Sequence, residues 1–439
     1  MSIKPGFLST QQPSLPHVAD QHVRRLMEVE QRMAESQYGA DACRRPRSVG
    51  IVGAGVMGAS IAAAVAGRQI PVVMVDENAQ ALATVRQRIS SWLQARPAAN
   101  EAARVDLDRL VRFGGLDEAA QCDVVVESVA EKIAVKQQVL TDLEPRLAAG
   151  AILASNTSTI PFARLSSPLR DPGRLCGCHF FLPIGQAPML EIIRGEKTHL
   201  QTVAAAVGFA RAIGHLPLVV ADVPGFVVNR LLVPYLSAAM QLLVEGVTVE
   251  AVESAAERFG MLCGPLRLMD GIGLDTALQC GWAISEDSSD LVAASPLLVA
   301  MVKARQLGCK ARAGFFLYEA DEPTPQGLNP ALQAALARCP QTPRPHTAET
   351  VIWRLLAPML LEATRMLQRG DVRDAGQIDL AVVLGFGFPA SRGGLLYWAD
   401  TVGAARIVEW FDTLDYLGDR AEPTPLLRKM SQCGRMFYA

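Results

Sequence analysis

Short apolar runs alternate with helix-like segments from Ser48 to about Asp222. Such alternation of strands and helices is typical of a mostly parallel sheet covered by helices, so the pattern predicts an α/β domain here. The predicted strands are residues 49–52, 71–75, 124–126, 151–154, 176–181, 190–193 and 216–220.

After Pro224-Gly225 the pattern changes to long helical stretches, and within them a segment recurs. Arg230-Leu-Leu-Val-Pro234 returns as Arg354-Leu-Leu-Ala-Pro358, an offset of 124 residues. The same offset relates Glu245-Gly246 to Arg369-Gly370 and Gly264-Pro265 to Phe388-Pro389. The repeat predicts a duplicated helical unit of roughly 50 residues, whose copies we expect to pack face to face. Chance similarity of amphipathic helices is the alternative.

These patterns predict five segments. Residues 1–47 form an N-terminal extension with a helix at Val23–Tyr38, and 48–222 form the α/β domain. A first helical unit (223–320), a Pro-rich connecting loop (321–345) and a second helical unit (346–439) follow.

Composition narrows the range of partners and locations. The chain has 439 residues and a formal charge of -2, and its basic residues do not cluster, which argues against nucleic-acid or anionic-membrane binding. Nine cysteines without a Cys-x-x-Cys pair suggest reduced thiols, so we expect no metal site and a cytoplasmic location. No apolar run reaches 18 residues and no signal peptide is evident, so we predict no membrane span.

The segment Gly53-Ala-Gly55-Val56-Met57-Gly58 lies between a predicted strand and an Ala-rich helix. In this pattern the glycines permit a sharp turn, a close backbone approach to a pyrophosphate and tight helix packing. Asp76 ends the next strand, where a carboxylate binds ribose hydroxyls and repels a 2′-phosphate. The spacing predicts a Rossmann-type domain that binds NAD in preference to NADP. Glycines placed for packing alone are the alternative.

His179 and Glu191 both stand in apolar runs where polar residues are costly to bury. Pairing would offset that cost, fix the imidazole tautomer and leave its other nitrogen to accept a proton. We therefore predict a catalytic dyad, against the alternative of a structural histidine.

Further polar residues lie at predicted strand or helix ends. Ser155 follows a strand, at the edge where open α/β sheets bind ligands, and we assign it to the substrate. Asn229 stands in the first turn of a helix, and its counterpart in the repeat is Trp353, so the unit itself does not need the amide. Glu127, Glu131 and Lys136 follow another strand; each is a candidate for cofactor or substrate contact, with a solvated helix face as the alternative.

Taken together, these motifs resemble those of the L-3-hydroxyacyl-CoA dehydrogenases. The resemblance rests on the glycine segment, Glu127-Ser-Val-Ala-Glu131, Ser155-Asn-Thr-Ser158, His179-Phe-Phe with Glu191, and Pro224-Gly-Phe-Val-Val-Asn229-Arg. It extends over residues 48–415 and is strongest to the dehydrogenase half of the bacterial fatty acid oxidation complex α subunit, without the hydratase half.

The resemblance implies reversible, NAD-dependent oxidation of a (3S)-3-hydroxyacyl-CoA, with His179 as general base and Glu191 orienting it. It further implies that Ser155 and Asn229 bind substrate oxygens, that Glu131 and Lys136 lie near cofactor and CoA, and that a separate enoyl-CoA hydratase or thiolase is a partner.

The chain departs from that pattern at Leu182, where the family has Asn, and at Ala187, where it has Met. These departures raise the alternative of a carrier-protein-bound or specialised 3-hydroxyacyl thioester substrate. A non-catalytic NAD-binding scaffold is the remaining alternative.

Overall fold

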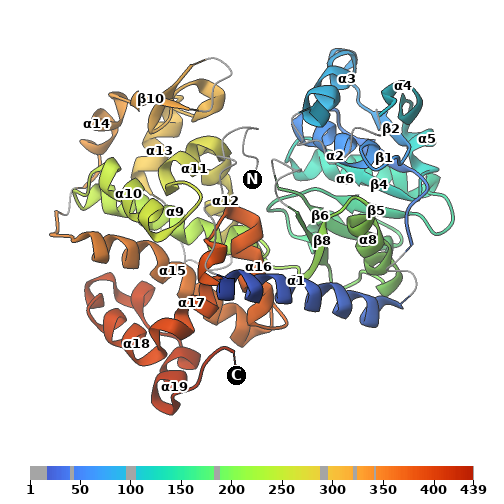
Figure 1. Ribbon diagram of the computed structural model, residues 1–439. Coiled ribbons are helices and arrows are strands. Elements are labelled where there is room, and N and C mark those ends of the chain that lie inside the picture. Colours follow the sequence, from blue (N-terminus) through green and yellow to red (C-terminus); the bar gives the residue numbers. More distant parts are fainter. Residues whose placement is uncertain are drawn as a thin grey trace. The chain divides into compact units, whose positions relative to one another are not determined.

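The computed structural model describes residues 17–39, 44–94, 105–181, 188–286, 295–319, 324–340 and 343–438. The chain forms two compact units, and each is described by itself below (Figure 1). Met27–Asp222 make the sheet unit, and Val223–Ala439 together with Met1–Leu26 make the helical unit.

An eight-stranded sheet forms the centre of the sheet unit, in the order β3-β2-β1-β4-β5-β6-β7-β8. All neighbouring strands are parallel except β6 and β7, which are antiparallel. The predicted mostly parallel sheet is therefore confirmed. The strands are β1 (Val49–Val52), β2 (Val72–Val75), β3 (Val111–Phe113), β4 (Val124–Glu127), β5 (Ile152–Ser155), β6 (Leu175–His179), β7 (Met189–Arg194) and β8 (Leu216–Ala221).

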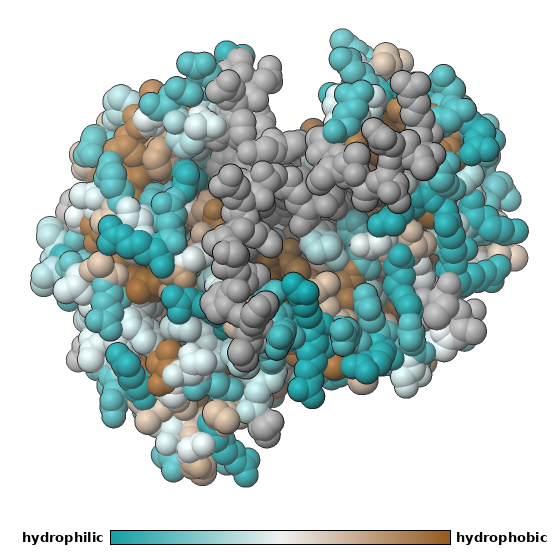
Figure 2. Space-filling view, in the orientation of Figure 1, coloured by the Kyte–Doolittle hydropathy of each residue, from teal (hydrophilic) through white to brown (hydrophobic). Residues whose placement is uncertain are grey.

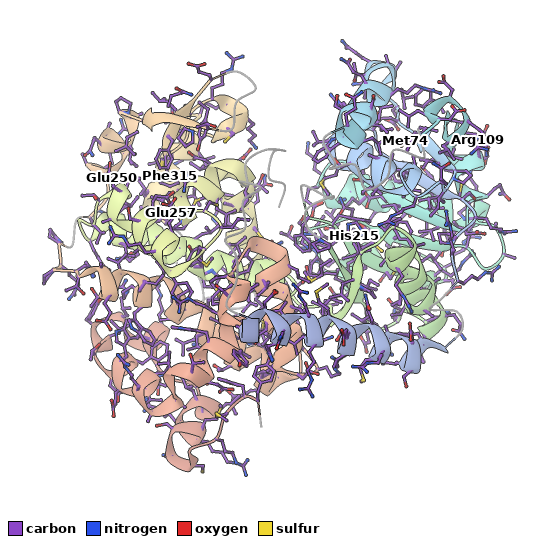
Figure 3. The ribbon with its side chains drawn as sticks, in the orientation of Figure 1. Met74, Arg109, His215, Glu250, Glu257 and Phe315 are labelled. Atoms are coloured by element: carbon purple, nitrogen blue, oxygen red, sulfur yellow. The ribbon has the colours of Figure 1, made fainter. Side chains whose placement is uncertain are left out.

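Apolar side chains explain how helices cover this sheet. The helix after the glycine segment, α2 (Val56–Ala66), is buried from Gly58 to its end, because its alanines allow the sheet to approach closely. Met74, labelled in Figure 3, is one of the fully buried residues of the same core. The other helices are α3 (Ala79–Gln94), α4 (Leu107–Leu110), α5 (Leu116–Ala120), α6 (Ile133–Leu143), η2 (Glu144–Arg146), α7 (Phe162–Leu165), η3 (Pro172–Arg174) and α8 (Leu200–Ala212).

Helices dominate the second unit. They are α9 (Val228–Val244), α10 (Val249–Phe259), α11 (Pro265–Ile272), α12 (Leu274–Ser285), α13 (Pro296–Lys303), η4 (Cys309–Ala311), α14 (Ala331–Leu336), α15 (Ala348–Arg369), α16 (Ala375–Phe386), η5 (Ala390–Arg392), α17 (Leu395–Val402), α18 (Ala404–Asp412), η6 (Asp415–Ala421) and α19 (Pro425–Cys433).

The predicted connecting loop at 321–345 is not a plain loop. It contains β10 (Pro325–Leu328), which pairs with β9 (Phe316–Tyr318), and the short helix α14. Two of the prolines that suggested a loop stand where regular structure tolerates them, because Pro325 begins the strand and Pro330 is the N-cap of the helix.

Reciprocal ion pairs join the two copies of the repeat. Arg230 of α9 donates through Nε to Glu362 of α15, and both side chains are fully buried. In return, Arg354 of α15 donates to both oxygens of Glu245 at 3.0 and 3.1 Å. The arginine at the equivalent position of each copy thus binds a carboxylate of the other copy. This is the face-to-face packing that the repeat predicts.

The repeat also extends further than the sequence indicated. Glu253 on α10 accepts a hydrogen bond from the backbone of Leu266 at the start of α11, and Asp379 on α16 does the same for Leu396 at the start of α17. The constant offset of 124 fails here: it is 126 between Glu253 and Asp379 and 130 between Leu266 and Leu396, so the second copy is longer both before Asp379 and around η5. Phe388-Pro389 therefore precedes η5 and is not the start of α17.

A second carboxylate in each copy holds its C-terminal end. Asp270 on α11 accepts from the backbone nitrogens of Phe315, labelled in Figure 3, and Phe316, each at 3.0 Å. Asp400 on α17 accepts from those of Phe437 and Tyr438 at 2.8 and 2.9 Å. Burial raises the pKa of Asp270 to about 7, against the opposing effect of these hydrogen bonds.

The N-terminal helix α1 (His17–Tyr38) is longer than predicted and contributes to both units. In the helical unit the His22 ring lies 4.1 Å from the ring of Tyr397, and in the sheet unit Arg211 donates to Glu35. Among the described residues, none of the helices is both long and apolar enough to cross a membrane. Figure 2 shows hydrophilic side chains over most of its visible face, with small separate apolar patches.

We predict that Glu245→Gln lowers the free energy of unfolding by on the order of 3 kcal/mol, because it leaves the Arg354 charge buried without its carboxylate. Urea unfolding followed by circular dichroism measures this. Glu349→Gln is the control. Glu349 lies in the first turn of α15, the helix that contains Arg354, and its ion pair with Arg406 is exposed. Equal stability of the two variants would contradict the role given to the buried pair.

Candidate active site

The glycine segment forms a tight turn between β1 and α2. Gly53 has φ +113°, and a Cβ there or at Gly58 would collide with backbone, with Ser128 in the first case and with Gly53 itself in the second. Gly55 differs, since a Cβ at this position would have no atom within 4 Å. The turn and the helix packing thus account for Gly53 and Gly58, whereas open space lies in front of Gly55, at the N-terminus of α2. A pyrophosphate fits that position.

Asp76 closes this turn from the end of β2. Its Oδ2 accepts from the Ala54 backbone at 2.6 Å, and its Oδ1 accepts from that of Asn78 at 2.8 Å. The half-buried carboxylate is therefore held beside the glycine segment, where a ribose would lie. Val56 and Met57 form the first turn of α2, and the Val56 side chain is exposed.

Three polar side chains stand in a row where neighbouring strands end. Glu127 is the last residue of β4, Ser155 the last of β5 and His179 the last of β6. The register pairs Glu127 with Ser155 directly, and Ser155 with Gly177, two residues before the histidine. In open α/β sheets ligands bind at this carboxyl edge. The sheet therefore gathers its buried polar groups on the edge that also carries the glycine turn.

The predicted pair of His179 and Glu191 is present. Because β7 runs antiparallel to β6, its third residue lies directly opposite the last residue of β6, and the register pairs the two. His179 Nδ1 is 2.7 Å from Glu191 Oε2, and both residues have 0% exposure. The carboxylate occupies Nδ1, so any proton exchange with a ligand would take place at the other ring nitrogen, Nε2.

Burial controls the charge of this histidine. Loss of solvent lowers the pKa of His179 below its ordinary value of 6.5, and the hydrogen bond and charge of Glu191 only partly oppose that shift. The imidazole is therefore mostly neutral at pH 7, which is the state a general base requires. The ring of Phe181 meets it edge-on, at 4.5 Å between centroids.

A buried carboxylate, Glu127, connects the other polar groups. Its Oε2 accepts from the Ser155 hydroxyl at 2.6 Å, and its Oε1 accepts from Lys136 Nζ at 2.9 Å. Lys136 is 1% exposed and also lies 3.2 Å from Glu131. Since its ammonium is held between two carboxylates inside the protein, any effect of Lys136 on a ligand would be transmitted through Glu127 or Glu131.

Glu131 is the more exposed carboxylate of this group, with 32% of its side chain accessible. Its Oε1 accepts from the Thr157 hydroxyl at 2.6 Å and from the Ser158 backbone at 2.9 Å. Burial alone would raise the pKa of Glu131, but the Lys136 ammonium and these hydrogen bonds hold that pKa below its ordinary value. Glu131 is thus a fixed negative charge that a ligand can reach.

Asn229 belongs to the helical unit, apart from the residues of the sheet unit described above. It lies in the first turn of α9 and is fully buried. Its counterpart Trp353 instead packs against the rings of Trp398 and Trp410, at 5.4 and 4.9 Å between centroids. The second copy uses this position for aromatic packing, so an amide there is not needed for the helix pair.

Sequence reasoning missed two connections of this edge. It left Glu127 undecided between a solvated face and a site residue, although the strand that ends in Glu127 is buried throughout. It also passed over Asn156, whose Oδ1 accepts from the Phe180 backbone at 3.1 Å and so ties the end of β5 to the residue after His179. The available signal in the sequence was the single amide, Asn156, within a run of hydroxyl residues. The departures at Leu182 and Ala187 lie outside the described residues.

Family models match most of both units. The one described as 3-hydroxyacyl-CoA dehydrogenase, NAD binding domain, matches residues 48–223. The one described as 3-hydroxyacyl-CoA dehydrogenase, C-terminal domain, matches twice, at 225–318 and 351–438. The cofactor of the sheet unit is therefore NAD, in agreement with the glycine turn and Asp76.

Two of the similar proteins are bacterial. The fatty acid oxidation complex subunit alpha of Pseudomonas savastanoi pv. phaseolicola is 34% identical over 420 residues, which are 93% of this chain but 58% of that protein. The (S)-3-hydroxybutyryl-CoA dehydrogenase of Ralstonia eutropha is 32% identical with a TM-score of 0.58, over 63% of this chain and 100% of its own.

A third similarity concerns the fold alone. The 3-hydroxybutyryl-CoA dehydrogenase of Escherichia coli K12 is 23% identical, with a TM-score of 0.76 over 89% of this chain and 99% of its own.

We predict that Gly55→Ala weakens NADH binding about tenfold or more without lowering the melting temperature. The new methyl group meets no protein atom but occupies the space in front of the helix N-terminus. Fluorescence titration and thermal unfolding measure the two effects. Gly58→Ala is the comparison, because its methyl group collides with Gly53 and should lower stability first. Unchanged NADH affinity in Gly55→Ala would show that the cofactor does not approach this turn.

Proposed function

The chain belongs to the 3-hydroxyacyl-CoA dehydrogenase family, and we propose that it oxidises (3S)-3-hydroxyacyl-CoA to 3-oxoacyl-CoA, reversibly, with NAD as oxidant. The observation that carries this proposal is the buried pair of His179 and Glu191 at the carboxyl edge of an NAD-binding sheet. The activity is a proposal for this chain because the match spans only 58% of the fatty acid oxidation relative.

The proposed chemistry separates a hydride from a proton. Bound NAD supplies the acceptor for the hydride that leaves C3 of the substrate. His179 accepts the proton of the 3-hydroxyl at Nε2, so that the C–O bond becomes a carbonyl as the C–H and O–H bonds break. In the opposite direction the imidazolium returns the proton to the carbonyl oxygen.

Glu191 acts on this step through the histidine. Its carboxylate binds Nδ1, which fixes the tautomer that presents Nε2 as an acceptor and stabilises the imidazolium formed during the reaction. Glu131 is the candidate for direct contact with the cofactor, because it combines a fixed negative charge with partial exposure. Ser155 and Asn229 complete the proposed set as polar groups for the bound ligands.

The chemistry of the reaction defines the enzymes that would act beside this one. Hydration of an enoyl thioester supplies a 3-hydroxyacyl thioester, and thiolysis consumes a 3-oxoacyl thioester. We therefore propose a separate enoyl-CoA hydratase or thiolase as partner. A substrate bound to a carrier protein undergoes the same chemistry at C3, and rates on matched CoA and carrier-protein thioesters separate the two.

We predict that His179→Gln lowers kcat by about 100-fold or more, because an amide cannot accept the proton, while NADH affinity changes little. An NADH absorbance assay on a series of 3-hydroxyacyl thioesters measures the rate. His215→Gln is the control, since His215 (Figure 3) is another buried histidine of the sheet unit, and its Nδ1 lies 3.3 Å from the Ile213 carbonyl oxygen. Full turnover in His179→Gln, or none in the unmodified protein on any such thioester, would refute the proposed function.

A further inference from the structure

The hydroxyl of Ser155 is already engaged on both sides. It donates to Glu127 Oε2 at 2.6 Å, and its oxygen accepts from the Thr157 backbone at 3.3 Å. Ser155 and Glu127 both have 0% exposure, so water does not compete for these bonds. A hydroxyl has one hydrogen and two lone pairs, which leaves one lone pair of Ser155 for a ligand.

The direction of the bond between Ser155 and Glu127 follows from the other partners of the carboxylate. Glu127 Oε1 accepts from Lys136 Nζ at 2.9 Å and from the Val129 backbone at 2.8 Å. Glu127 is the acid partner of a buried ion pair with Lys136, and a carboxylate in an ion pair only accepts hydrogen bonds. Ser155 must therefore be the donor in the short bond, and its only hydrogen points away from any ligand.

We propose that Glu127 is a positioning residue that makes Ser155 a hydrogen-bond acceptor, so that Ser155 binds only a ligand group that carries a hydrogen. Within the proposed function, on which this inference rests, the 3-hydroxyl of the substrate gives its one hydrogen to His179. The group left for Ser155 near the reacting carbon is therefore the carboxamide N–H of the nicotinamide. The keto oxygen of a 3-oxoacyl thioester carries no hydrogen and is excluded as a partner.

This arrangement divides the work between two polar groups of the same edge. Because Ser155 only accepts, it gives no hydrogen bond to the negative charge that develops on the substrate oxygen. Stabilisation of that charge therefore depends on the imidazole of His179. Lys136 supports the arrangement from the side away from the ligand, because its ammonium forms a buried ion pair with Glu127. Ser155 thus selects the hydrogen-bearing member of a pair of ligands.

The test uses ligands that differ only in that hydrogen. We expect Ser155→Ala to weaken the hydrogen-bearing ligand about tenfold and to change the affinity of its hydrogen-free analogue less than about twofold. The cofactor pair is NAD and its 3-acetylpyridine analogue, which has no amide N–H, and this pair should respond. The substrate pair, a 3-hydroxyacyl and a 3-oxoacyl thioester, is the comparison and should not respond, because the 3-hydroxyl gives its hydrogen to His179.

Glu127→Gln should strengthen binding of the hydrogen-free analogue, whereas Ser155→Ala weakens binding of the hydrogen-bearing ligand. The new amide can donate to Ser155, which frees the serine hydrogen for a ligand, so the hydrogen-free analogue should bind about fivefold tighter than to the unmodified protein. A loss of packing would weaken every ligand and tighten none. In the double variant, Ser155→Ala should abolish this gain, because Glu127 acts through the serine.

Asp123→Asn is the matched control. Asp123 directly precedes β4, so it lies at the opposite end of this strand from Glu127, and it forms an ion pair with Arg47. It should leave all four affinities unchanged. The inference is overturned if Ser155→Ala weakens NAD and its 3-acetylpyridine analogue equally, or if Glu127→Gln folds and does not tighten binding of that analogue. Affinities are measured by equilibrium binding, so this result is separate from turnover, on which the proposed function stands or falls.

Discussion

A buried hydrogen bond between an imidazole and a carboxylate is the interaction on which the account of this protein depends. His179 and Glu191 are both withdrawn from water, and each would be costly there alone. The single antiparallel strand pair of the sheet places them opposite each other, so the fold itself sets the 2.7 Å distance. Burial lowers the pKa of the imidazole and the carboxylate fixes its orientation, and both effects suit the general base that we propose.

The rest of the sheet unit arranges charge around that pair. Consecutive strand ends carry Glu127, Ser155 and His179, while the glycine turn at the end of β1 leaves open space before a helix N-terminus. Buried carboxylates also organise the helical unit, where Glu245 and Glu362 each bind an arginine from the other copy of the repeat. In both units buried ion pairs connect separate elements.

Much of the fold and of the candidate site was predictable, because the features concerned depend on the spacing of residues that are close in the sequence. The glycines, Asp76 and the apolar runs around His179 and Glu191 predicted the turn, the cofactor and the dyad. Bonds that depend on strand order were not predictable: Glu127 meets Ser155 only because β4 and β5 are neighbours in register. The repeat was found through Arg230 and Arg354, but its true extent emerged only from the carboxylates that hold later helices, since the loop at η5 changes the spacing. The prolines of 321–345 suggested a loop because their positions at element starts are not visible in composition.

The central claim is that His179 is a buried, neutral base. The pH dependence of kcat/KM for oxidation of a 3-hydroxyacyl thioester tests it most directly, because that profile reports the pKa of the base in the free enzyme. Burial lowers the pKa of His179, so the account predicts that activity is retained at neutral pH and is lost on acidification with a midpoint below 6.5. A midpoint at or above 6.5, or a profile that His179→Gln leaves unchanged, would contradict it.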